Sequence, residues 1–151
     1  MGTTIGTMCV RRSGFLKASL ERVWEEFASL ERMRGWFGIG HTLHAYEAKL
    51  GANVELSVEL DGERQHYGGA VTVFEPLREV TFDCNWHEPS MAWSVPTMWT
   101  LRLTPVYDGT MVEILHHGFE RLGAIGGSEL ECFEDGWDNK HLKALRAIVE
   151  R

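Results

Sequence analysis

The chain of 151 residues has no long apolar run, no low-complexity tract and no internal repeat. No apolar run approaches the ~20 residues that a membrane-spanning helix needs, so we expect no membrane partner. Residues 1–10 also lack the basic start and apolar stretch of a signal peptide, so the expected location is cytoplasmic. The composition, 44% hydrophobic and 25% charged, is typical of a globular protein and predicts one domain over residues 1–151.

Cysteine is scarce and arranged without a pattern. Cys9, Cys84 and Cys132 are odd in number, widely spaced and outside any CxxC motif, which favours three reduced thiols over disulfides or a zinc knuckle. The His41-x-x-His44 pair is the remaining metal candidate, but residues three apart on a strand point to opposite faces. We therefore expect no metal and no cofactor.

Basic residues are fewer than acidic ones. Lys and Arg number 15 against 22 Asp and Glu, which gives a formal net charge of -7. Nucleic acids and anionic membranes attract clustered Lys and Arg, so neither is expected as a partner. We interpret the acidic side chains as mostly solvated charge. Motifs for nucleophilic catalysis and phosphate binding are missing too, because there is no GxSxG elbow and the glycine-rich stretch 123–127 lacks a Gly-Lys-Ser/Thr ending.

The middle of the chain alternates apolar and polar residues with the period of a β-strand. This pattern predicts strands at residues 42–49, 53–59, 65–75 and 78–86, preceded by one at about 5–18. Asp61-Gly62 predicts a hairpin turn, and a second turn at Asp108-Gly109 separates two further strands near 99–104 and 110–117. Because the side-chain period is two, His116 and His117 must point to opposite faces, so only one of them can face the core.

Helical periodicity marks two places. Ser19 and Ser29 are predicted to cap two short helices. Ser128 is predicted to cap one long helix running to about Glu150, whose broad apolar face carries Trp137 and must lie across a sheet. The loop of residues 87–96 is unusually apolar and is either a lid or a cover for the sheet edge.

Short motifs follow one another in a specific order along nearly the whole chain: residues 18–24, 35–38, 73–76 with 80–82, 103–106 with 108–110, His116 with 118–119, and 136–137. In this order they resemble the START-like, polyketide-cyclase-like (SRPBCC) superfamily, and within it the branch named after the heat-shock-protein ATPase activator domain. The resemblance implies an α+β helix-grip fold, a curved antiparallel sheet of six to seven strands with two short helices and a long C-terminal helix across the concave face.

The resemblance also implies an apolar cavity between sheet and helix, although activities in such families diverge widely. The favoured function is the binding of a hydrophobic or aromatic metabolite in this cavity. The alternatives are a cyclase, dehydratase or hydrolase using His116 as acid/base, and a chaperone-associated module with a chaperone or homodimer partner. His141 stands where the family often has Leu, which adds a titratable group to the gripping face. The candidate ligand-binding residues are Trp36, Trp86, Met98, Trp99, Ile114, His116, Phe119, Trp137 and His141.

Overall fold

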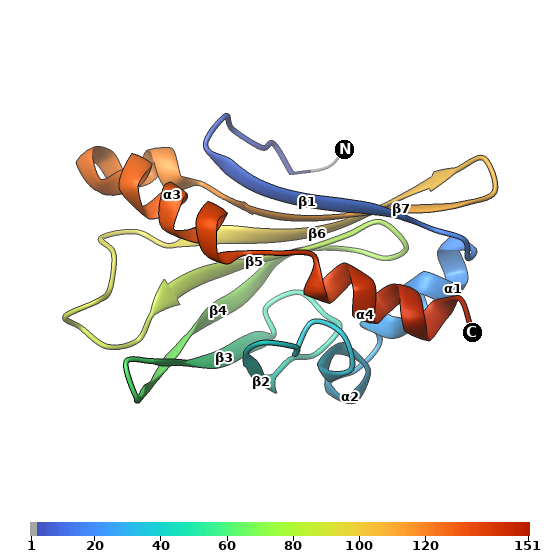
Figure 1. Ribbon diagram of the computed structural model, residues 1–151, viewed down its shortest axis with the longest axis horizontal. Helices are drawn as coiled ribbons and strands as arrows, with labels where there is room; N and C mark the ends of the chain where they lie inside the picture. The colour runs from blue at the N-terminus through green and yellow to red at the C-terminus, as the bar shows by residue number, and fades with distance from the viewer. Residues whose placement is uncertain (1–2) are drawn as a thin grey trace.

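The alternating segments form one curved antiparallel sheet in the computed structural model, which describes residues 3–151 (Figure 1). The strand order is β1-β7-β6-β5-β4-β3-β2, so every chain neighbour except β1 and β2 is also a sheet neighbour. The strands are β1 (Cys9–Leu16), β2 (Thr42–Ala45), β3 (Asn53–Leu60), β4 (Glu63–Glu75), β5 (Glu79–Trp86), β6 (Thr97–Val106) and β7 (Gly109–His117).

The helices cover one face of this sheet, as the helix-grip prediction requires (Figure 1). They are α1 (Leu20–Trp24), η1 (Glu25–Phe27), α2 (Leu30–Arg34), η2 (Phe119–Ile125), α3 (Gly126–Gly136) and α4 (Lys140–Val149). The predicted caps of the first two α-helices are confirmed, because Ser19 accepts from the Arg22 N–H and Ser29 from the Arg32 N–H. No helix of the described residues combines the length and apolarity that crossing a membrane requires.

The single long C-terminal helix was a wrong prediction, because the chain breaks between α3 and α4. Gly136 ends α3, and Trp137 adopts extended dihedrals (φ -109°, ψ 130°). Glycine is a poor helix former, and Asp138 Oδ1 then accepts from the Lys140 N–H at 3.0 Å, which starts a new helix. Ser128 is not a cap, since its hydroxyl donates to the Ile125 carbonyl from inside α3.

The turns and strand ends lie close to where the sequence predicted them, with two small differences. Asp61 and Gly62 both have positive φ (52° and 82°), as the predicted hairpin turn requires. The β6–β7 turn lies one residue earlier than expected, because Gly109 already pairs with Val106 in the ladder. Strand β2 is shorter than 42–49, since its register with β3 shifts after Leu43.

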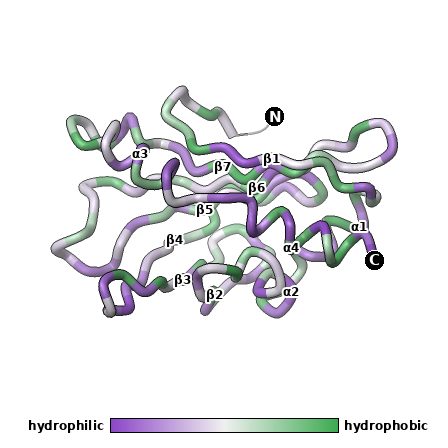
Figure 2. The backbone as a smooth tube through the Cα atoms, in the orientation of Figure 1, coloured by the Kyte–Doolittle hydropathy of each residue, from purple (hydrophilic) through white to green (hydrophobic). Residues whose placement is uncertain are grey.

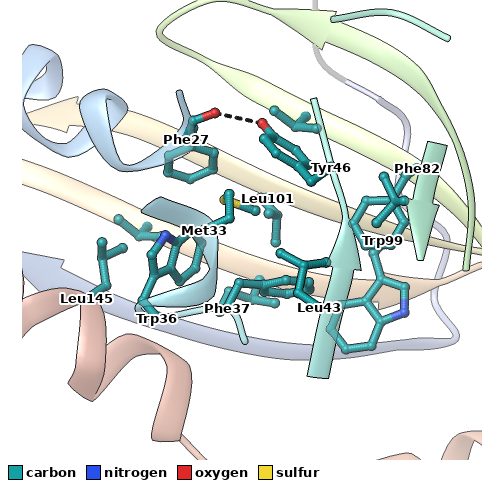
Figure 3. Close-up of a cluster of buried hydrophobic side chains, with 14 of the residues drawn as sticks. Phe27, Met33, Trp36, Phe37, Leu43, Tyr46, Phe82, Trp99, Leu101 and Leu145 are labelled. Carbon is teal, nitrogen blue, oxygen red and sulfur yellow. Dashed lines mark hydrogen bonds between the residues drawn. The ribbon is translucent and has the colours of Figure 1, made fainter. Parts of the chain in front are cut away.

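The space under α4 is filled by side chains. Figure 3 shows Trp36, Phe37 and Leu145 packed together in the main core. Figure 2 shows that apolar and polar residues alternate along α4, so one side of this helix is apolar and packs on the core. His116 and His117 point to opposite faces as predicted, so only His116 faces the helices. His117 is buried as well, on the other side of the sheet, where its Nε2 lies 2.7 Å from the Thr100 hydroxyl.

Candidate functional site

An unfilled cavity of about 430 Å³ lies beside the helix break rather than under a continuous helix. Strands β3 to β6 form its floor, and the segment before β2, helix α3 and the start of α4 form its sides. Its wall is mainly aromatic, from Tyr67, Trp86, Trp99, Phe133 and Trp137. The break places the Trp137 ring edge-on to Trp99, with ring centroids 5.1 Å apart.

The mouth of the cavity is apolar as well. Ile39 and Leu60 are about two-fifths exposed, at 41% and 39%, and Val58 and Met91 complete this rim. Met91 belongs to the 87–96 loop, which therefore contributes to the cavity. Trp93 of the same loop is buried and donates to Glu129 of α3 at 2.7 Å, so the loop also anchors that helix.

Four of the nine residues predicted for the site line this cavity: Trp86, Trp99, Trp137 and His141. Four others, Trp36, Ile114, His116 and Phe119, are fully buried in the packed interior and do not line it. Met98 pairs with His117 across the ladder and shares that side of the sheet, opposite to Trp99.

His116 is held behind Trp99, with the two rings stacked at 4.6 Å. The Thr97 hydroxyl donates to the Cys84 carbonyl, so it accepts the His116 Nε2–H at 2.7 Å. Burial, and then the neighbouring His117, lower the pKa of His116 to about 3. Its ring is therefore neutral at pH 7. The ring also lies outside the cavity lining, so it cannot act on a ligand bound there.

The polar part of the cavity is a pair of histidines, of which the sequence had indicated only His141. His41 contacts the Phe37 carbonyl through Nε2 at 2.6 Å and the Tyr67 hydroxyl through Nδ1. His141 contacts the Trp36 carbonyl through Nδ1 at 3.2 Å. The two rings stack with centroids 5.2 Å apart.

Both rings are neutral at pH 7. Burial, and then the neighbouring His141, lower the pKa of His41 to about 4, against a weaker opposing effect of the Phe37 carbonyl. Burial also lowers the pKa of His141 to about 4. Burial raises the pKa of the Tyr67 phenol, which therefore keeps its proton.

The model of a protein family described as "Activator of Hsp90 ATPase homolog 1-like protein" matches residues 17–150. The chain belongs to this family. The resemblance stated from the motifs is thereby confirmed, including the branch. No curated protein matches the chain.

Solved structures similar to this family member share its fold. A Chromobacterium violaceum protein, CV1439, is 20% identical, with TM-score 0.70 and coverage of 97% of this chain and 99% of that one. The Aha1 dimer from Colwellia psychrerythraea is 15% identical (TM-score 0.59; 94% and 96% coverage). DynU16, from the dynemicin biosynthetic locus, is 20% identical (TM-score 0.66); 96% of this chain is covered, but it spans only about half, 48%, of DynU16.

Sequence reasoning missed several lining residues of this family member, above all His41, Tyr67 and Lys140. Tyr67 pairs with Trp86 across the β4–β5 ladder, so its cavity position followed from strand register, which the sequence did not give. His41 precedes β2 in an irregular segment where no period assigns a face. Among residues 3–151, no three His, Cys, Asp or Glu side chains gather closely enough to hold a metal ion.

Proposed function

We propose that this protein binds a small, mostly apolar aromatic molecule in the cavity beside the α3–α4 break. The observation that carries the proposal is an unfilled space of about 430 Å³ bordered by three indole rings, Trp86, Trp99 and Trp137. Small-molecule sites have volumes of ~300–1,000 Å³ and predominantly apolar walls. Aromatic rings stack in offset or edge-to-face geometry, and the existing Trp99–Trp137 pair already shows the second arrangement.

The state of the histidines supports binding over acid/base catalysis. General acids and bases work best with pKa values near the working pH. The pKa values of His41 and His141 are lowered to about 4, so neither ring exchanges protons near neutral pH, which disfavours them as general acids or bases. His116, the residue on which the enzyme alternative depended, lies outside the cavity lining.

A chaperone-associated role, with a homodimer or chaperone partner, is the second proposal. It is supported by the family description and by a neighbour that is an Aha1 dimer. Size-exclusion chromatography with light scattering and a pull-down with purified chaperone test it. A monomer that the chaperone does not retain would contradict it.

Binding is tested by tryptophan fluorescence and calorimetry. Titration with naphthalene, 2-naphthol and flavonoid-type polycycles is expected to give saturable quenching, because the ligand would stack on indoles that line the cavity. Native mass spectrometry of freshly purified protein should detect one bound small molecule per chain. Absence of both quenching and heat across the panel would rule out the proposal.

Filling the cavity is expected to abolish binding while keeping the fold. Val58 lines the cavity from β3, so Val58→Trp places an indole in the space that the ligand needs. Overpacking costs about 1–3 kcal/mol, and we expect affinity for 2-naphthol to fall at least tenfold. Glu59→Trp is the matched control, because the next residue on a strand points to the other face. Equal affinity of the two variants would place the ligand elsewhere.

A further inference from the structure

The hydrogen positions on the two cavity histidines are fixed by their carbonyl partners. A backbone carbonyl only accepts hydrogen bonds, so the ring nitrogen facing it must carry the proton. In His141 that nitrogen is Nδ1, which lies 3.2 Å from the Trp36 carbonyl oxygen. Because the ring is neutral, Nε2 carries no proton and presents a lone pair. Nε2 has no hydrogen-bond partner among the described residues and is not sealed in the interior.

The same reasoning fixes the second histidine. His41 Nε2 lies 2.6 Å from the Phe37 carbonyl oxygen and must be its protonated nitrogen. Nδ1 is then an acceptor, so the Tyr67 hydroxyl donates its only hydrogen to it. The phenol oxygen is left with lone pairs alone, and it can serve a ligand only as an acceptor.

The free polar atoms that His141 and Tyr67 present to the cavity are therefore acceptors. The indole N–H groups of Trp99 and Trp137 are buried without a partner and closed to solvent, so they do not open into the cavity. Lys140 shares its ammonium with Asp138 at 3.0 Å but has three N–H bonds, and the Trp86 indole N–H has no partner among the described residues, so the wall also offers donors at these two residues. Glu129 adds a further acceptor, since it is a carboxylate already paired with an indole N–H.

We propose that the ligand is an aromatic molecule bearing an O–H or N–H donor, as in phenols and hydroxylated polycycles, and that it donates this hydrogen to His141 Nε2. The inference rests on the proposed binding function and narrows it to one chemical class. The oxygen of an aromatic ether or ketone placed against His141 Nε2 and the Tyr67 oxygen would meet only lone pairs there and lose its hydration without replacement.

Three probes of one ring system test this on the unmodified protein. Naphthalene has no polar group, 2-methoxynaphthalene has an acceptor only, and 2-naphthol adds the donor. By isothermal titration calorimetry at pH 7, 2-naphthol is expected to bind about tenfold tighter than its methyl ether. One hydrogen bond to a poorly solvated acceptor changes an affinity by about this factor. Equal affinities for the three would overturn this inference and leave the binding function standing. No binding of any probe would remove both.

A variant and a spectroscopic measurement locate the acceptor. His141→Phe keeps a ring against Phe37 and His41 but removes Nε2. The preference for 2-naphthol over its methyl ether should disappear, and the affinity for naphthalene in the same variant measures any change in the packing of the wall. If that variant does not fold, nitrogen-15 NMR of the unmodified protein labelled at histidine shows directly which ring nitrogen of His141 carries the proton. A protonated Nδ1 with a bare Nε2 that shifts on adding 2-naphthol supports the assignment, and a protonated Nε2 on His141 overturns it.

Discussion

Acidification from pH 7 to pH 5 is expected to reduce the free energy of unfolding by about 5 kcal/mol, a third or more of the ~5–15 kcal/mol of an ordinary domain. Burial lowers the pKa of His117 too, but the main cause is three other largely buried histidines, His41, His116 and His141. Their pKa values fall from 6.5 to about 4, about 3 and about 4, mainly because burial disfavours the charged ring.

The sign follows from proton uptake in the two states. Below pH 6.5 the unfolded chain protonates these histidines, whereas the folded protein keeps them neutral until the pH approaches their lowered pKa values. The unfolded state therefore binds more protons in this window, and stability falls as the pH falls through it. Each histidine contributes roughly 2 kcal/mol between pH 7 and pH 5, and the stabilisation is fully present above pH 6.5.

Urea unfolding monitored by circular dichroism at pH 7, 6 and 5 measures the effect. His116→Gln keeps a side-chain N–H near Thr97 and should reduce the acid loss by roughly 2 kcal/mol. His66→Gln removes an exposed ring and serves as the control, with the pH dependence of the parent protein. A free energy of unfolding that stays constant from pH 7 to pH 5 would show that the histidines titrate normally and are not enclosed.

The strands of the sheet could be predicted because the pattern that produces each one lies within its own residues. Each strand shows a period of two in its own residues, and the Asp61-Gly62 turn supplies the positive φ values that a tight hairpin needs. The family motifs then supplied the order of layers. The α3–α4 break had a visible signal in Gly136, but continuous apolar spacing on both sides favoured one helix. What stabilises the break is distant in sequence, since Arg12 of β1 donates to the Trp137 carbonyl at 2.8 Å.

The site was only half predictable for a related reason. The indoles Trp86 and Trp99 lie on well-patterned strands, so alternation and neighbouring register placed them on one face of the sheet. His116 shares that face, but the sequence could not show that Trp99 and Phe133 would pack on both sides of it. His41 reaches the cavity through an irregular segment, and only tertiary structure brings it beside His141.

Buried acidic residues were the other surprise, because the sequence had suggested solvated carboxylates. Glu79 is fully enclosed on the sheet face opposite the helices. Its Oε1 accepts from Arg102 Nε at 3.0 Å, and its Oε2 accepts from the Thr3 N–H at 2.9 Å and from the Thr3 hydroxyl. Burial raises the pKa of Glu79, but the hydrogen bonds from Thr3 and Arg102 outweigh it and hold the pKa below the ordinary value.

Arg102→Met is expected to destabilise the protein by about 3–5 kcal/mol, because it leaves the Glu79 carboxylate buried without its cation. In a chain of this size that corresponds to a loss of roughly 10 °C in Tm, measurable by calorimetry at pH 7. Arg102 also donates to the Thr3 carbonyl at 2.7 Å, so the segment before β1 should become more accessible to hydrogen exchange in the same variant.

Two controls separate the buried charge from the loss of an arginine. Arg11→Met breaks a more exposed pair with Glu113, 3.5 Å long and with the Arg11 side chain 58% exposed, and should cost less than about 1 kcal/mol. The double variant Arg102→Met with Glu79→Leu removes both charges and should be more stable than Arg102→Met alone, since no unpaired carboxylate remains in the interior. A double variant less stable than the single one would mean that Glu79 stabilises the fold through Thr3 rather than through Arg102.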